Sequence, residues 1–252
     1  MNPKLKQIIK SVVPNQLIEY RKSLINRRNL YRYSSCITMS QAGQDYWVYG
    51  DVFNEKQDGF FLDIGAHDGV FLSNTFILEK RYSWKGICIE ANPKSFVDLV
   101  VNRNCRCINM CIDKQNGSVS FKLNGIMGGI VASDVDNSEA RQKEVVDIDA
   151  ITLKQLLKDE KAPAVIDYLS IDIEGAEDRA LLEFDFDTYQ FNCLTIERPS
   201  VALRELLACK DYMLIKEITG LDSFYIHKSF KKTFQQNLFE FGLKKFLIKR
   251  WK

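Results

Sequence analysis

Short apolar runs alternate with amphipathic segments along most of the chain. Five runs have the length of strands: FFLDI (60–64), GICIE (86–90), CRCINMCI (105–112), AVIDYLSID (164–172) and FNCLTIE (191–197). The segments between them have helical spacing, and cap or first-turn residues mark four starts: Ser73, Pro93, Thr152 and Ser200. Because strands that alternate with helices form parallel sheets covered on both faces, the pattern predicts an α/β fold.

Two regions depart from this alternation. The runs at 212–219 and 222–229 are joined at Gly220 by too few residues for a crossover helix, so they predict an antiparallel hairpin at the sheet edge. Residues 114–150 are rich in glycine and small polar residues, which predicts an inserted β-ribbon with a mobile loop placed to cover a site. A surface insertion without function is the alternative.

Charge separates the two ends from the rest of the chain. Residues 1–32 carry eight lysines or arginines against Glu19, residues 228–252 carry eight against Glu240, and the body between them is acidic. We expect a basic helical arm at 1–35, one domain at 36–228 and a basic amphipathic tail at 229–252. Such ends fit peripheral contact with an anionic membrane, or simple packing on the domain, and the acidic body argues against a nucleic-acid partner.

Length and cysteine usage limit the class of protein further. With 252 residues and 46% hydrophobic content, the chain can bury one substantial core. It contains no run of about 18 apolar residues and no clear signal peptide, so we expect a cytoplasmic protein, with the inner membrane as the surface for peripheral contact. Seven cysteines without a CxxC pair predict reduced thiols, and the histidines and cysteines form no zinc pattern.

The stretch DIGAHDG (63–69) directly follows the first predicted strand and indicates a ligand site. Gly65 and Gly69 lack Cβ atoms, so a ligand can approach the backbone, and Glu90 closes the second strand where an acidic residue can bind ribose hydroxyls. The spacing is not GxGxxG, and Asp63 and Asp68 would repel a pyrophosphate. A cationic nucleoside cofactor fits better, which indicates S-adenosylmethionine.

A second acidic motif, IDIEGAE, follows the fourth predicted strand. Asp172 and Glu174 are two positions apart and therefore lie on one side of an extended chain, where they are candidates for orienting an acceptor or removing its proton. Contact with the cofactor alone and ligation of a divalent cation are the alternatives, and we do not favour a metal. We expect Glu177 to be more exposed at a helix start, Glu197 to line the acceptor pocket, and His67 to serve as a weaker candidate base.

Three motifs in order resemble the FkbM-type S-adenosylmethionine-dependent methyltransferases, over roughly residues 38–228. They are SQAGQDYWV, the stretch FLDIGAHDGVFLSNTFILEKRYSWKGICIEANPKSF, and YLSIDIEGAEDRALLEF. The resemblance implies a class I, Rossmann-like fold with a seven-stranded sheet. It places Asp63, Gly65, Ala66, His67 and Gly69 around the methionine part, Glu90 on the ribose, Ile112 and Asp113 beside the adenine, and Gln44 and Asn74 at the polar end. Family members often carry a histidine where this chain has Arg198 and Pro199, so no proton transfer is assigned there.

The resemblance implies O-methylation of a sugar hydroxyl on a surface polysaccharide, its lipid-linked precursor or a glycosylated metabolite. A nicotinamide-dependent oxidoreductase is disfavoured by the missing third glycine and by Asp68. A non-catalytic, membrane-docked subunit of a glycan assembly system is the remaining alternative, and the basic ends are its support.

Overall fold

Seven strands form the main sheet of the computed structural model, which describes residues 38–137 and 144–250. They are β1 (Phe60–Ile64), β2 (Lys85–Ile89), β3 (Arg106–Ile108), β8 (Val165–Ile171), β9 (Gln190–Glu197), β10 (Tyr212–Glu217) and β11 (Asp222–His227). Their order is β10-β11-β9-β8-β1-β2-β3, and β11 runs antiparallel to the other six strands, which are parallel to one another. The predicted parallel sheet with an antiparallel edge hairpin is therefore confirmed. The predicted arm at 1–35 lies outside the described residues.

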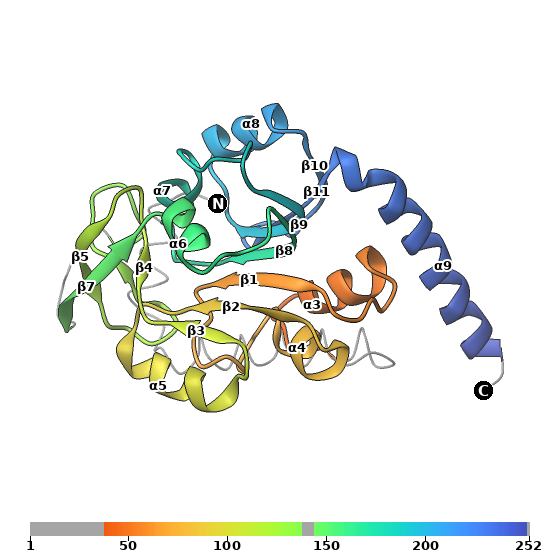
Figure 1. The fold of residues 1–252 in the computed structure, drawn as a ribbon, viewed down its shortest axis with the longest axis horizontal. Coiled ribbons are helices and arrows are strands. Elements are labelled where there is room, and N and C mark those ends of the chain that lie inside the picture. Colours follow the sequence, from red (N-terminus) through yellow and green to blue (C-terminus); the bar gives the residue numbers. More distant parts are fainter. Residues whose placement is uncertain (1–37, 138–143, 251–252) are drawn as a thin grey trace.

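Helices cover both faces of this sheet (Figure 1). One face carries α4 (Phe76–Tyr82) and α5 (Pro93–Asn102), and the other carries α6 (Leu153–Asp159), α7 (Glu177–Leu181) and α8 (Val201–Cys209). Alternate residues of β1 serve the two faces, because Phe61 packs in one hydrophobic core and Leu62 in the other. Thr152 and Ser200 cap α6 and α8 as predicted, since each side chain accepts a hydrogen bond from a first-turn amide.

The insertion forms a second sheet at one end of the first (Figure 1). Its strands are β4 (Cys111–Ile112), β5 (Gly117–Lys122), β6 (Gly129–Ile130) and β7 (Val145–Ile151), in the order β4-β7-β5-β6. The predicted strand at 105–112 is thus divided between two sheets. Asn109 marks the division, because its amide donates to the backbone oxygens of Glu90 at 2.7 Å and Ala91 at 3.0 Å.

Helical segments before β1 and after β11 pack together at the other side of the domain. They are α3 (Gln44–Tyr46), the π-helix η1 (Trp47–Val52), the 3-10 helix η2 (Lys228–Phe230) and α9 (Lys231–Arg250). Phe234 and Phe241 of α9 are buried, and the Phe241 ring lies over Gly50, where a Cβ would collide with it. The first half of the predicted tail therefore belongs to the packed domain. In the described ranges, every helix falls short of the length and apolar character needed to cross a membrane.

Candidate active site

A cavity of about 250 Å³ lies at the carboxyl ends of the parallel strands. Gly65, Glu90 and Asp172, which directly follow β1, β2 and β8, line it together with Glu197, the last residue of β9. Gly125, in the insertion, lines it as well, so the glycine-rich loop borders the site as the sequence analysis expected. In an open α/β sheet this edge is where ligands bind.

The two glycines of the turn after β1 have steric roles within the protein. A Cβ on Gly65, whose φ is +88°, would collide with the backbone oxygen of Asp172, so the glycine lets β1 and β8 end close together. A Cβ on Gly69 would meet Arg103 Cγ at 2.6 Å and Leu99 Cδ1 at 2.7 Å. Gly65 still lines the cavity, whereas Gly69 faces the protein interior rather than the predicted ligand.

Glu90 is held at the end of β2 by backbone donors. Its two carboxylate oxygens accept hydrogen bonds from the amides of His67 and Asn92, each at 2.7 Å. Burial raises the pKa of Glu90 to about 7, although these two hydrogen bonds oppose the shift. Each oxygen keeps further acceptor capacity toward the cavity, which is what a pair of ribose hydroxyls requires.

Asp63 lies deeper in the same half of the site and is supported by a cation that the sequence analysis missed. Its Oδ2 accepts a hydrogen bond from Thr75 Oγ1 at 2.6 Å, and Arg103 donates to the same hydroxyl at 3.0 Å. Burial raises the pKa of Asp63, and the Arg103 guanidinium opposes the shift. Arg103 follows α5, and no local sequence pattern connects it with the turn at 63–69.

Two buried polar atoms on the cavity wall form no hydrogen bond with the described residues, although Asp68 Oδ1 lies 3.7 Å from one of them, His67 Nδ1. They are His67 Nδ1 and Asn74 Oδ1, while Asn74 Nδ2 donates to Ser170 Oγ at 3.0 Å. His67 also has φ 50°, a left-handed conformation that is unfavourable for a non-glycine residue. Unpaired atoms beside a carboxylate that retains acceptor capacity fit a polar, nucleoside-containing ligand. Ala66 lines the cavity between Gly65 and His67.

One end of the cavity, beside β3 and β4, is apolar. Its lining there includes Met110, Cys111, Ile112, Phe121, Ile126 and Ile130. Ile112 therefore lies where the sequence analysis placed the adenine. Asp113 does not line the cavity, because both of its oxygens accept hydrogen bonds from Arg179, at 2.7 and 3.0 Å. The buried Asp113 carboxylate is used in this ion pair, and its place beside the adenine stays a prediction.

The opposite end of the cavity is acidic because of the strand register. Ile196 pairs with Ile171 on one side, and Glu197 pairs with Asp222 on the other. The carboxylates of Asp172, Glu197 and Asp222 therefore follow one another across β8, β9 and β11. The pKa of Asp172 is raised well above its usual value by burial, then by the charges of Glu197, Asp222 and Glu174, and by a hydrogen bond with Glu197. The Asp172 side chain is nevertheless open to the cavity, so it can meet a ligand.

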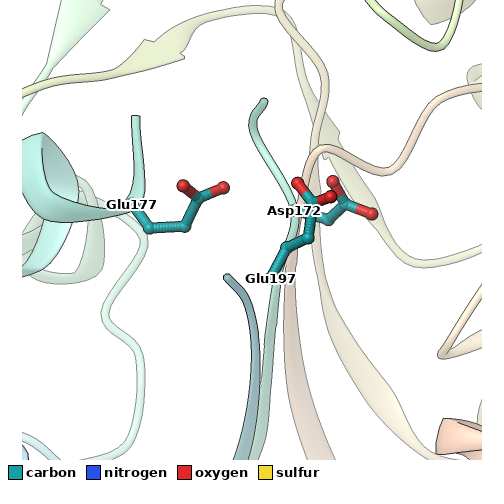
Figure 2. Close-up of side chains that lie close together, drawn as sticks. All are labelled: Asp172, Glu177 and Glu197. Carbon is teal, nitrogen blue, oxygen red and sulfur yellow. The ribbon is translucent and has the colours of Figure 1, made fainter. Parts of the chain in front are cut away.

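Glu177 faces this pair from the start of α7 (Figure 2). The expectation that Glu177 is the more exposed carboxylate was wrong, since the residue is 3% exposed. Its Oε1 accepts the amide of Ile173 at 2.9 Å, and burial raises its pKa to about 8. The chain from β8 into α7 folds back at Glu174, which has φ 56°, and this bend brings Glu177 over the strand ends.

Arg198 supplies positive charge at the acidic end. Its guanidinium lies 2.8 Å from Glu197, 2.7 Å from Asp136 of the insertion and 3.6 Å from Glu174. Glu174 and Asp172 both line the cavity, and the cation near Glu174 is Arg198. Gln44 also lines this region, yet its side-chain nitrogen donates to Asp222 and its oxygen accepts the Ala42 amide, so both ends are engaged.

Metal ligation at this end is geometrically conceivable from the carboxylates alone. One oxygen each from Asp172, Glu177 and Glu197 lies within 4.8 Å of the others (Figure 2). Hard divalent cations take such oxygen ligands. Arg198 already pairs with Glu197, however, and a cation would have to compete with it.

Comparison with known proteins places this site in a family. The model of the methyltransferase FkbM domain matches residues 63–238. Similar solved structures include a methyltransferase FkbM from Methylobacillus flagellatus KT, 14% identical, covering 74% of this chain and 51% of that one at a TM-score of 0.45. TrmK from M. capricolum, solved with S-adenosyl-homocysteine, is 14% identical, with coverages of 69% and 63% and a TM-score of 0.38. A human methyltransferase 10 domain containing protein is 11% identical, with coverages of 84% and 96% and a TM-score of 0.44.

These structural likenesses are too distant to carry an argument about function. The chain spans 51% of the length of the Methylobacillus flagellatus protein and 63% of the length of TrmK. No curated protein matches it. The family match covers well over half of the chain and includes both the glycine turn and the acidic end of the cavity. The chain belongs to the FkbM family of S-adenosylmethionine-dependent methyltransferases.

Proposed function

We propose that this chain transfers a methyl group from S-adenosylmethionine to a hydroxyl of a sugar. The observation that carries the proposal is the order of groups along the cavity. An apolar end at Ile112 is followed by Glu90, then the turn at Gly65, then the carboxylates of Asp172 and Glu197. This order matches the order of adenine, ribose, methionine and methyl acceptor.

Residues on three strand ends would hold the cofactor. Ile112 and its apolar neighbours suit the adenine, and Glu90 suits the ribose hydroxyls. His67 Nδ1 and Asn74 Oδ1, which form no hydrogen bond with the described residues, suit the polar groups of the methionine part. S-adenosylmethionine supplies an electrophilic methyl group on a sulfonium. The acidic surroundings of Asp63 and Asp172 favour a cation of that kind over a pyrophosphate.

The acidic pair provides a route for the hydroxyl proton. Asp172 forms a hydrogen bond with Glu197, and burial together with the nearby charge of Glu197 raises the pKa of Asp172. When bound, S-adenosylmethionine would give up its methyl group to the acceptor oxygen, the sulfonium would become a neutral thioether, and the Asp172 carboxylate would take the hydroxyl proton. A carboxylate whose pKa is raised is a stronger base than a free aspartate. Glu174 and Arg198 would position the acceptor beside this pair.

A polyhydroxylated acceptor fits the acidic end for a simple reason. Carboxylates accept hydrogen bonds from hydroxyls, and Asp172, Glu174 and Glu197 all line the cavity there. A sugar presents neighbouring hydroxyls, so one can be held by Glu174 while another is directed to the pair. The family resemblance supports the same acceptor class, on a surface glycan, its lipid-linked precursor or a glycosylated metabolite.

The test is label transfer from methyl-labelled S-adenosylmethionine to a panel of sugars and glycans, with mass spectrometry to locate the methyl group. We expect a labelled O-methyl sugar from the intact protein and from Glu205→Gln, an exposed control on α8. Asp172→Asn should form little product while binding the cofactor normally. Calorimetric binding of the cofactor without transfer to any panel member would overturn the sugar proposal. Failure to bind S-adenosylmethionine at all would favour a non-catalytic subunit, and binding of NAD(P) instead would favour an oxidoreductase.

A further inference from the structure

The C-terminal helix α9 carries apolar residues on two of its faces. Phe234 and Phe241, seven positions apart, share the face that packs on η1, and Asn237 on the same side donates to the Val52 backbone oxygen at 2.8 Å. Phe239 and Leu243, four positions apart, share another face and are 68% and 47% exposed. The first face fixes the helix to the domain, and the second is open to a partner.

Cationic residues accompany the open face. Lys232 lies seven positions before Phe239, hence on the same side of the helix, and it is exposed, as is Lys231. Residues 244–252 add four lysines and one arginine in the sequence without a single acidic residue. Exposed apolar residues with exposed lysines on the same side of a helix are a combination that suits contact with an anionic membrane interface.

We propose that the open face of α9, with Phe239 and Leu243 as its apolar anchors, docks on an anionic lipid surface. Charge favours this occupant over a second copy of the chain. A two-fold contact through the same face would bring one cationic segment against its equivalent, whereas anionic headgroups attract both. The helix is held at the side of the domain away from the insertion, as Figure 1 shows, so docking leaves the insertion clear of the lipid. The proposal does not depend on the methyl acceptor.

The buried face decides which variants test this proposal. Deleting the helix would remove Phe234 and Phe241 from the hydrophobic core, so loss of binding would not be informative. Phe239→Glu with Leu243→Glu changes only exposed positions. Val100→Glu with Val101→Glu on α5 is the matched control, because those valines are 51% and 80% exposed on another helix and the same two charges are added.

The experiment is co-sedimentation of the full chain with vesicles of phosphatidylcholine alone or mixed with phosphatidylglycerol. We expect binding to the mixed vesicles only, and release at about 1 M salt, where the Debye length is about 3 Å. The Phe239/Leu243 variant should lose at least about tenfold in partition coefficient and the α5 control less than about threefold, while Lys231→Gln with Lys232→Gln should lose about fivefold per removed charge. Circular dichroism should give the same folded signal for all variants.

Three results would overturn the proposal. The first is failure of the intact chain to bind the mixed vesicles even at low salt. The second is an equal loss in the α5 control, which would mean that net charge alone governs binding. The third is a dimer in sedimentation velocity that the Phe239/Leu243 variant converts to a monomer while vesicles are ignored, which would assign the face to a second copy.

Discussion

Both halves of the cavity contain carboxylates whose pKa values are raised by burial, but the groups that surround these carboxylates differ. In the half formed by β1 and β2, Glu90 accepts two backbone amides and Asp63 lies beside Arg103. In the half formed by β8 and β9, Asp172 faces other carboxylates, and their charges add to burial in raising its pKa. The first arrangement fixes acceptor atoms in place, as binding requires. The second raises the affinity of Asp172 for a proton, which suits a group that accepts one in the proposed reaction.

The largest expected effect on turnover comes from replacing the Asp172 carboxylate. Asp172→Asn should lower turnover by about 10²- to 10⁴-fold, because Asp172 is lost as the proton acceptor and Glu197, which pairs with Arg198, replaces it poorly. Cofactor affinity should change less than about twofold. Adding Glu197→Gln should cost little more, since the two groups act as one pair. Steady-state kinetics and calorimetric titration measure the two quantities. A loss confined to cofactor affinity would move Asp172 into the binding half and remove the contrast.

The second prediction concerns the binding half. Glu90→Gln should weaken S-adenosylmethionine binding by about 10- to 100-fold, because one of the two acceptor oxygens is replaced by an amide donor, which leaves donors facing it unpaired. Turnover at saturating cofactor should change little. Titration calorimetry of this variant beside Glu183→Gln, an exposed control, measures the effect. Unchanged affinity would show that the ribose lies elsewhere.

The residues that line the half formed by β1 and β2 were easier to predict from the sequence than the contacts in the half formed by β8 and β9. The glycine turn and Glu90 are local: each follows its own strand, so reading strands in order was sufficient. Placing Asp172 beside Glu197 needs the β8–β9 register, which pairs Ile171 with Ile196 across many residues of separation. The position of Asp222 next to Glu197 needs the antiparallel register of β11 as well. Neither register is specified by any short motif.

Contacts between side chains that are distant in the sequence were the second feature that the sequence analysis could not predict. Asp113 was predicted beside the adenine from its position after Ile112, but Arg179, on α7, binds its carboxylate. Glu177 was expected to be exposed because helix starts usually are, whereas the left-handed bend at Glu174 turns it inward. In both cases a long-range contact decided the role of a residue whose local sequence pattern was ordinary.

The third prediction uses the cost of burying Glu177. Its pKa of about 8 in the folded protein lies above the usual 4.5, so between these pH values the folded state holds a proton that the unfolded state releases. Stability should therefore fall as pH rises from about 4.5 to about 8 and then level off. Glu177→Gln keeps an acceptor for the Ile173 amide and removes this penalty. It should stabilise the protein by roughly 1 to 3 kcal/mol at pH 8 and by almost nothing below pH 4.5.

Thermal or urea unfolding of both proteins across this pH range measures the difference. A matched variant, Glu205→Gln on the exposed side of α8, should leave the pH profile unchanged. If Glu177→Gln destabilised the protein equally at every pH, the Glu177 carboxylate would be serving as a fixed hydrogen-bond partner, and the two halves of the cavity would not differ as proposed.

The smallest expected effect is that of divalent cations. The spacing of Asp172, Glu177 and Glu197 would suit one, but Arg198 lies 2.8 Å from Glu197 and already supplies positive charge there. We therefore expect EDTA to change turnover by less than about twofold and Mg²⁺ or Mn²⁺ to shift the melting temperature by less than about one degree, since a ligand that does not bind the folded state cannot stabilise it. Differential scanning fluorimetry reads the second quantity without any acceptor. A stabilisation by Mg²⁺ that disappears in Asp172→Asn but persists in Glu205→Gln would establish a metal centre. The half of the cavity formed by β8 and β9 would then serve metal-assisted chemistry.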